Sequence, residues 1–86
     1  MWSLYFYKMY YVYILKCKDG KYYTGCTSDL KGRFRSHAKG QVSETSDKLP
    51  VELLHYSAFI DKYKAFNFER YLKTGSGRAF MKKRFV

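Results

Sequence analysis

The sequence predicts an α/β (α+β) fold: a small three-stranded, mostly antiparallel sheet flanked by helices, in the order strand, strand, helix, strand, helix, helix. Three observations predict it. An Asp-Gly pair separates two tyrosine-rich runs that have the composition of strands. Helix-capping residues precede two stretches with apolar residues at helical spacing, and another apolar run lies between those stretches. Because 86 residues have room for one small core, we expect residues 1–86 to form a single domain.

The first two strands are predicted over about residues 10–17 and 21–27, where aromatic and β-branched residues are enriched. The pair Asp19-Gly20 between them is a strong short-range signal for a hairpin. The strand pattern needs nothing before it. We therefore expect residues 1–8 to be an N-terminal extension, with Met9 as an alternative start.

The hairpin has two possible registers. A two-residue loop would put Tyr13 and Tyr23 on opposite faces of the sheet, because a slip of one residue exchanges the faces. A three-residue loop, with Gly20 as a left-handed bulge residue, would place Tyr13 opposite Gly25 and both tyrosines on one face. Glycine is unfavourable inside a strand unless its space is needed. We predict the bulged register.

A first helix is expected to begin with Ser28 or Asp29 as its N-cap and to end near Gly40. A polar connection follows and is closed by Pro50. The apolar run over residues 51–60 predicts a third strand, most of it buried.

A second helix is predicted from its N-cap Asp61 through Thr74, with Gly75 in the stop position. Residues 78–85 then form a short basic helix. The segment Gly75-Ser76-Gly77 has two interpretations. Its main-chain N–H groups would cradle a phosphate, or it is a helix stop followed by a new N-cap at Ser76.

The net charge is +10, from 17 Lys and Arg against 7 Asp and Glu, which predicts a polyanionic partner, above all nucleic acid. The only two cysteines, Cys17 and Cys26, form neither a dense cysteine framework nor a metal-ligand spacing, so we expect reduced thiols in a cytoplasmic protein. The apolar start of the chain lacks the basic region and cleavage site of a signal peptide. Because Lys8 and Lys16 bracket a run too short to span a bilayer, we expect no membrane partner.

One pair of polar residues and one single acidic residue stand out on the predicted helices. Arg33 and His37 are four residues apart and therefore lie on one helix face, beside an apolar stripe of Leu30, Phe34 and Ala38. Taken alone, this pair favours the ordinary interpretation, a solvated surface arginine and a partly buried histidine ring. Glu69 falls on the helix face that should meet the core, where an unpaired carboxylate is unfavourable. It is expected to be ion-paired, hydrogen-bonded or bound to a metal.

Together these residues resemble the GIY-YIG nuclease family. Residues 11–13 (Tyr-Val-Tyr) stand at the first motif and residues 23–25 (Tyr-Thr-Gly) at the second. The segment "SDLKGRFRSH" is similar to the family's helix with its catalytic arginine, here Arg33, and "FNFERYLK" to the segment that supplies the metal-binding acid, here Glu69. The resemblance covers about residues 10–84 and is strongest to the short, single-domain bacterial branch. The N-terminal nuclease domain of the excision-repair endonuclease and the phage homing endonucleases are also similar.

Three positions differ from the motifs of the family. Tyr11 stands where GIY has glycine, and Thr24 stands where YIG has isoleucine. Some members carry an asparagine after the acid. Asn67 lies two residues before Glu69, so it does not correspond to that residue.

The resemblance implies a metal-dependent endonuclease that hydrolyses phosphodiester bonds. Glu69 would hold one divalent cation, Mg²⁺ or Mn²⁺, at the scissile phosphate. Arg33 would donate to the phosphate oxygens, and Tyr13 or Tyr23 would orient and deprotonate the attacking water. His37 would assist that tyrosine or contact a phosphate. The residues alone do not decide between the two tyrosines.

The partner implied is DNA, or RNA, with structure or strand selectivity or recruitment by a protein partner. The oligomeric state is left open. There are two alternatives to an endonuclease. One is a DNA- or RNA-binding module of the same fold without turnover, and the other is a small subunit that docks on an acidic protein. The residues expected to bind nucleic acid are basic or hydroxyl side chains on the helices: Arg35, Lys73, Ser76, Arg78, Lys82 and Lys83.

Overall fold

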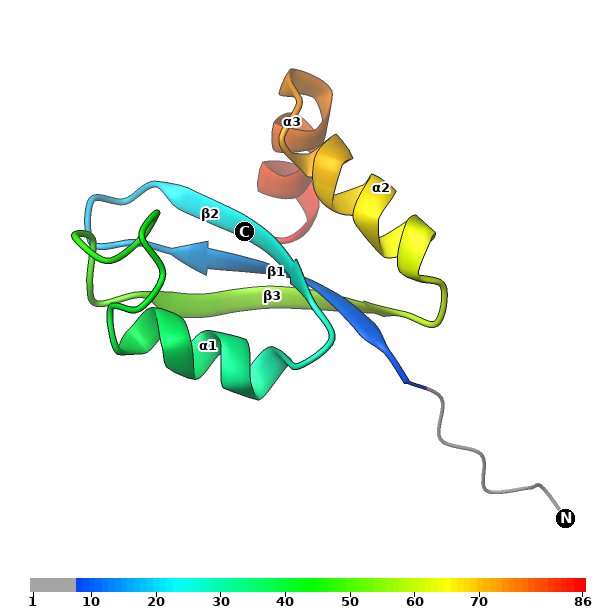
Figure 1. Ribbon diagram of the computed structural model, residues 1–86. Helices are drawn as coiled ribbons and strands as arrows, with labels where there is room; N and C mark the ends of the chain where they lie inside the picture. Colours follow the sequence, from blue (N-terminus) through cyan, green and yellow to red (C-terminus); the bar gives the residue numbers. More distant parts are fainter. Residues whose placement is uncertain (1–7) are drawn as a thin grey trace, which may run out of the picture.

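The computed structural model describes residues 8–86 and confirms the predicted order of elements (Figure 1). The extension expected over residues 1–8 lies, apart from Lys8, outside the described residues. No helix in the described part is long and apolar enough to cross a membrane. The strands and helices are β1 (Tyr10–Lys16), β2 (Tyr22–Thr27), α1 (Leu30–Ala38), β3 (Glu52–Phe59), α2 (Lys62–Leu72) and α3 (Gly75–Arg84).

The three strands form one sheet in the order β2-β1-β3, and both neighbouring pairs are antiparallel. The helix α1 lies against one face, while α2 and α3 lie against the other (Figure 1). Side chains of the central strand β1 alternate between these faces, because successive residues of a strand point to opposite sides. One strand therefore supplies residues to two different environments.

The hairpin has the predicted bulged register. Tyr13 pairs with Gly25 and Leu15 pairs with Tyr23, so Tyr13 and Tyr23 share a face. Gly20 has a φ of 82°, the left-handed conformation that a three-residue hairpin loop requires. A Cβ atom at Gly25 would collide with the phenol of Tyr13. Glycine is therefore needed at this position because the tyrosine ring crosses over it.

The apolar core lies between the sheet and the pair α2 and α3. Val12 and Ile14 of β1 pack there against residues of both helices, and phenylalanine rings surround this contact. Burial of this apolar surface is the main favourable term that holds the two helices on the sheet. The buried helix residues of this core are Ala65, Leu72 and Met81.

The third strand is less buried than expected. β3 is an edge strand whose residues are half-buried or exposed and none fully buried, with Tyr56 52% exposed. An uninterrupted apolar run favours a strand that is covered on both faces. Here α2 packs mainly against β1 and β2, which leaves parts of β3 open to solvent.

The junction between the last two helices also differs from the prediction. α2 ends at Leu72, and Thr74 is the N-cap of α3, its hydroxyl accepting a hydrogen bond from the Gly77 N–H at 3.1 Å. Gly75 is therefore the first residue of α3 rather than a helix stop, and Ser76 is not the N-cap. Threonine caps a helix well, and this local hydrogen bond determines the boundary. At the first helix, Asp29 is the cap, one of the two residues considered.

Candidate active site

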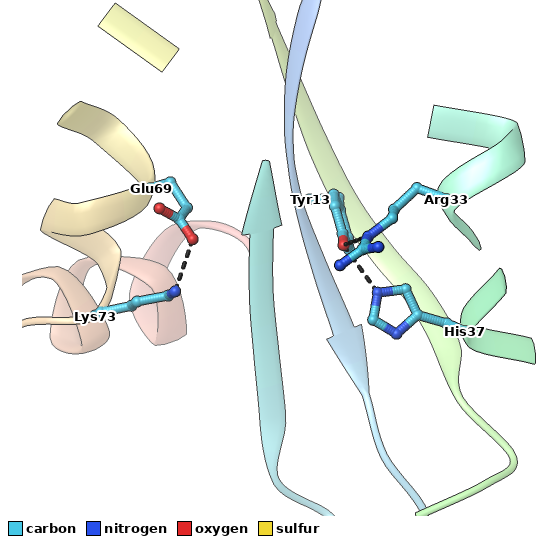
Figure 2. A network of polar contacts seen from close by, with 5 residues as sticks. All are labelled: Tyr13, Arg33, His37, Glu69 and Lys73. Carbon is cyan, nitrogen blue, oxygen red and sulfur yellow. Dashed lines mark hydrogen bonds and ion pairs between the residues drawn. The ribbon is translucent and has the colours of Figure 1, made fainter. Parts of the chain in front are cut away.

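The polar centre of the molecule is a cluster formed by Tyr13, Arg33 and His37 (Figure 2). The Tyr13 hydroxyl lies 2.8 Å from Nε2 of His37, and Nε of Arg33 donates to the same hydroxyl at 3.4 Å. Tyr13 comes from the central strand and is 1% exposed. A buried hydroxyl requires partners, and two side chains of α1 supply them.

The helix α1 positions Arg33 and His37 on one face, as their spacing predicted. The carboxylate of Asp29 caps the helix by accepting the N–H of Gly32 at 3.1 Å, which fixes where the first turn begins. The predicted apolar stripe is partly wrong, because Ala38 is exposed and His37 is the fully buried residue of the helix. His37 replaces an apolar contact by packing edge-on against aromatic rings.

Two tyrosines hold the imidazole of His37. Its ring centroid lies 5.6 Å from that of Tyr13 and 5.0 Å from that of Tyr23, in edge arrangements of the kind aromatic pairs prefer. The two tyrosine rings are 6.3 Å apart. The structure therefore brings together four of the predicted site residues: both tyrosines, the arginine and the histidine.

The sequence analysis missed Thr45, which is fully buried in the connection between α1 and β3. Its Oγ1 lies 2.8 Å from Nδ1 of His37 and also donates to the Val42 carbonyl at 3.5 Å. We assign the threonine hydrogen to the Val42 carbonyl, so that the threonine oxygen accepts the Nδ1–H of His37. Nε2 is then free to accept the hydroxyl hydrogen of Tyr13. No periodic pattern marks a buried threonine in a polar loop.

Burial decides the protonation of this cluster. It raises the pKa of Tyr13 to about 12, against the smaller lowering effect of the Arg33 hydrogen bond. Burial, followed by the charge of Arg33, lowers the pKa of His37 below its ordinary value. The hydrogen bond from Tyr13 is the largest effect raising the pKa of Arg33. At neutral pH the cluster therefore contains a phenol, a neutral imidazole and a guanidinium.

Glu69 is set apart from this cluster. Its carboxylate pairs with Nζ of Lys73 at 2.7 Å, one helical turn further on, and strand β2 passes between this pair and the cluster (Figure 2). The Glu69 side chain is 12% exposed and that of Lys73 is 53% exposed. The expectation that this acid is not left unpaired is met by an ion pair. Its ion-pair partner is Lys73, and in the described part of the chain it does not contact the tyrosines of the cluster through a hydrogen bond.

The donor set around Glu69 fits only one kind of cation site. Within residues 8–86, no group of three or more His, Cys, Asp or Glu side chains gathers to hold a metal. Mg²⁺ and Mn²⁺ accept a single carboxylate when water and substrate phosphates complete the coordination. Glu69 fits such a cation, provided that Lys73 moves aside.

A basic cleft of about 670 Å³ lies between β2 and the junction of α2 and α3. Three residues predicted to bind nucleic acid line it, namely Lys73, Arg78 and Lys82, and so does Lys21, which the sequence analysis did not single out. Tyr23 lines the same cleft. No acidic side chain is among its lining residues. The cleft is therefore suited to a phosphate-rich ligand.

The other three predicted nucleic-acid contacts do not line this cleft. Ser76 and Lys83 are exposed on α3. Arg35 is exposed on α1, which covers the opposite face of the sheet. The six residues therefore do not form one continuous surface.

Comparison with known proteins supplies the family context. A family model, described as the GIY-YIG catalytic domain, matches residues 9–84. A UPF0213 protein of Lacticaseibacillus paracasei is 43% identical over 67 residues, which are 77% of this chain and 75% of that protein. A UPF0213 protein of Clostridium perfringens is 42% identical over 66 residues, 76% of this chain and 71% of that protein. The solution NMR structure of a UPF0213 protein from Bacillus halodurans matches with a TM-score of 0.57 and 35% identity, over 87% of this chain and 83% of that chain.

Proposed function

The chain belongs to the GIY-YIG catalytic domain family, and on this premise we propose that it is a metal-dependent endonuclease that hydrolyses phosphodiester bonds in DNA. Membership of the family implies a nuclease that binds nucleic acid. The cation, the choice of DNA and the roles of individual residues are our proposal, with residues 1–86 taken as one nuclease domain.

The observation that carries the proposal is the position of Tyr23. Its ring packs against His37, and the same residue lines the basic cleft. Tyr23 thus borders both the polar cluster and a surface that attracts phosphate. A nucleic-acid backbone lying in the cleft would bring a phosphodiester to Tyr23, and the lysines and arginine around it would neutralise the neighbouring phosphates.

The two tyrosines are assigned different roles. Tyr13 is buried and has a pKa of about 12, so it is poorly suited to meet or deprotonate a water molecule. We assign it as a positioning residue that holds Arg33 and His37. Tyr23 is half-buried and borders the cleft, so it is the tyrosine that orients the attacking water.

Arg33 and Glu69 act on the phosphate from the two sides of β2. The guanidinium of Arg33, which is exposed beyond its contact with Tyr13, donates to phosphate oxygens as negative charge develops in the transition state. Glu69 holds the divalent cation. When bound, Mg²⁺ or Mn²⁺ would neutralise phosphate charge and lower the pKa of a bound water.

The cleft also suggests how substrates are chosen. Its charged groups suit backbone phosphates, and they offer little that distinguishes one base from another. We therefore propose weak sequence preference, with selection by strand or branch structure or by a recruiting protein partner.

A second candidate is supported by the Glu69–Lys73 pair. An acid already satisfied by an ion pair is compatible with a DNA- or RNA-binding module of the same fold that lacks turnover. In that case the cleft binds nucleic acid and Glu69 only stabilises α2.

Cleavage assays separate these functions. Labelled branched, single-stranded and duplex DNA would be incubated with and without Mn²⁺, using the wild-type protein, Glu69→Gln, Arg33→Ala and Tyr23→Phe. Lys64→Met, an exposed lysine on α2, serves as the control. The nuclease proposal expects metal-dependent cutting that is lost in Glu69→Gln and Arg33→Ala and kept in Lys64→Met. Binding without cutting by the wild-type protein, unchanged in Glu69→Gln, favours the binding module.

A further inference from the structure

Lys73 has two sets of neighbours. It is the C-cap residue of α2, and its Nζ lies 2.7 Å from the carboxylate of Glu69. It is also one of four basic residues that line the cleft, together with Lys21, Arg78 and Lys82. Lys73 therefore borders both the acid of the proposed metal site and the surface proposed to receive phosphates.

The pair is unequal in its freedom to move. Glu69 is 12% exposed at its side chain, whereas Lys73 is 53% exposed. The Lys73 backbone is fixed, because its N–H donates to the carbonyl of Arg70 at 3.1 Å. The long lysine side chain can therefore turn from Glu69 into the cleft without moving either helix.

We propose that Lys73 is a phosphate-operated gate on Glu69. This inference rests on the proposed function. In the free protein the ammonium group of Lys73 is ion-paired with the carboxylate of Glu69. A backbone phosphate entering the cleft takes over the ammonium group, and Glu69 becomes available to a divalent cation. The exchange leaves no charge unpaired: Lys73 passes from carboxylate to phosphate, and the carboxylate passes from lysine to metal.

The energies involved suit a reversible gate. Ion pairs one helical turn apart at a partly exposed position are weak, so phosphate can compete for the lysine. The three other basic side chains of the cleft, those of Lys21, Arg78 and Lys82, also attract the phosphodiester by their positive charge. The consequence is that the cation and the nucleic acid strengthen each other's binding.

The first measurement needs no metal and no turnover. The ¹³C signal of the Glu69 side-chain carboxyl would be followed by NMR, assigned by its loss in Glu69→Gln. Adding a short DNA oligonucleotide in EDTA is expected to shift this signal in the wild-type protein and to leave it in place in Lys73→Met. A wild-type signal that stays in place while the oligonucleotide binds overturns the gate.

The second measurement is Mn²⁺ affinity of the free protein, followed by electron paramagnetic resonance. Lys73→Met is expected to bind Mn²⁺ about two- to fivefold more tightly than wild type, because the competing ammonium is gone. Lys64→Met, which removes an equal charge from α2 outside the Glu69 pair and the cleft, is expected to change little. Equal gains in both variants would reveal a general charge effect and overturn the proposal. Because neither readout uses cleavage, the gate can be contradicted in an active nuclease, and it can be supported in a protein that does not cut.

Discussion

The hydroxyl of Tyr13 lies 2.8 Å from Nε2 of His37, at the point where the central strand meets α1. On its other side the imidazole lies 2.8 Å from Thr45. This row of three side chains connects a strand, a helix and a loop through hydrogen bonds inside the protein. Any change at one member leaves a buried polar atom on the next without its partner.

Thr45→Val is expected to slow DNA cleavage while leaving DNA binding unchanged. Valine has the shape of threonine but cannot accept the Nδ1–H of His37, so the tautomer that faces Tyr13 is no longer selected. The loss of one such hydrogen bond predicts about a tenfold fall in kcat with KM unchanged. Thr45→Ser keeps the hydroxyl and should retain most of the activity. Steady-state kinetics of the three proteins provides the check, and a rise in KM alone would contradict the assignment.

Acidification from pH 7 to pH 5 is expected to lower the free energy of unfolding. Burial lowers the pKa of both His37 and His55 in the folded protein, with Arg33 adding to the effect at His37. As pH falls below the ordinary value of 6.5, the unfolded chain takes up protons that the folded chain does not, so stability is lost. Urea unfolding across this range measures the slope. His37→Gln and His55→Gln should each flatten it, and a slope equal to wild type in both would exclude this cause.

Gly25→Ala is expected to destabilise the fold by about 1–3 kcal/mol, because the new methyl group meets the phenol of Tyr13 in a closely packed place. Gly75→Ala, at the start of α3, is the matched control because a Cβ atom there meets nothing within 4 Å. Chemical denaturation of both variants tests the prediction. Similar stability changes at the two glycines would show that space beside Tyr13 is not the reason for Gly25.

Removing cleft charges is expected to change the salt dependence of DNA binding. Arg78→Ala and Lys82→Ala should each weaken binding and reduce the slope of log affinity against log salt by about one. Arg35→Ala removes the same charge on α1, across the sheet from the cleft, and should change the slope less. Fluorescence anisotropy at several salt concentrations gives the slopes. A larger effect from Arg35 would place the DNA on the other face.

The elements that local chemistry specifies were predicted well. The hairpin register was predicted because Gly25 marks a position that must stay open. Asp29 was predicted as a possible cap because a short polar side chain just before a helix can accept a backbone N–H of the first turn, and in the structure it accepts that of Gly32. The predicted end of α2 was wrong because Thr74 and Ser76 are both residue types that can cap a helix. The hydrogen bond from the Gly77 N–H to the Thr74 side chain makes Thr74 the N-cap of α3.

The candidate site was predicted only in part, because its remaining contacts join distant segments. The spacing of Arg33 and His37 places them on one face, but whether Ala38 or His37 turns inward depends on partners elsewhere in the chain. Thr45 gives no pattern at all. For Glu69 the sequence indicated the need for a partner, and the structure identifies it as Lys73.

Tyr22 and Tyr23 are neighbours on β2, and the register of the hairpin, which depends on Gly25, determines which of them faces α1. If the loop closed one residue shorter, Tyr22 would turn toward α1 in place of Tyr23, so a tyrosine would still face the helix. In that alternative pairing Cys26 would lie opposite Tyr13, and its side chain would fill the space that Gly25 leaves open. Because the ring of Tyr13 needs the open space at Gly25, the longer loop is favoured over the shorter one, and Gly25 thereby determines which tyrosine becomes part of the site.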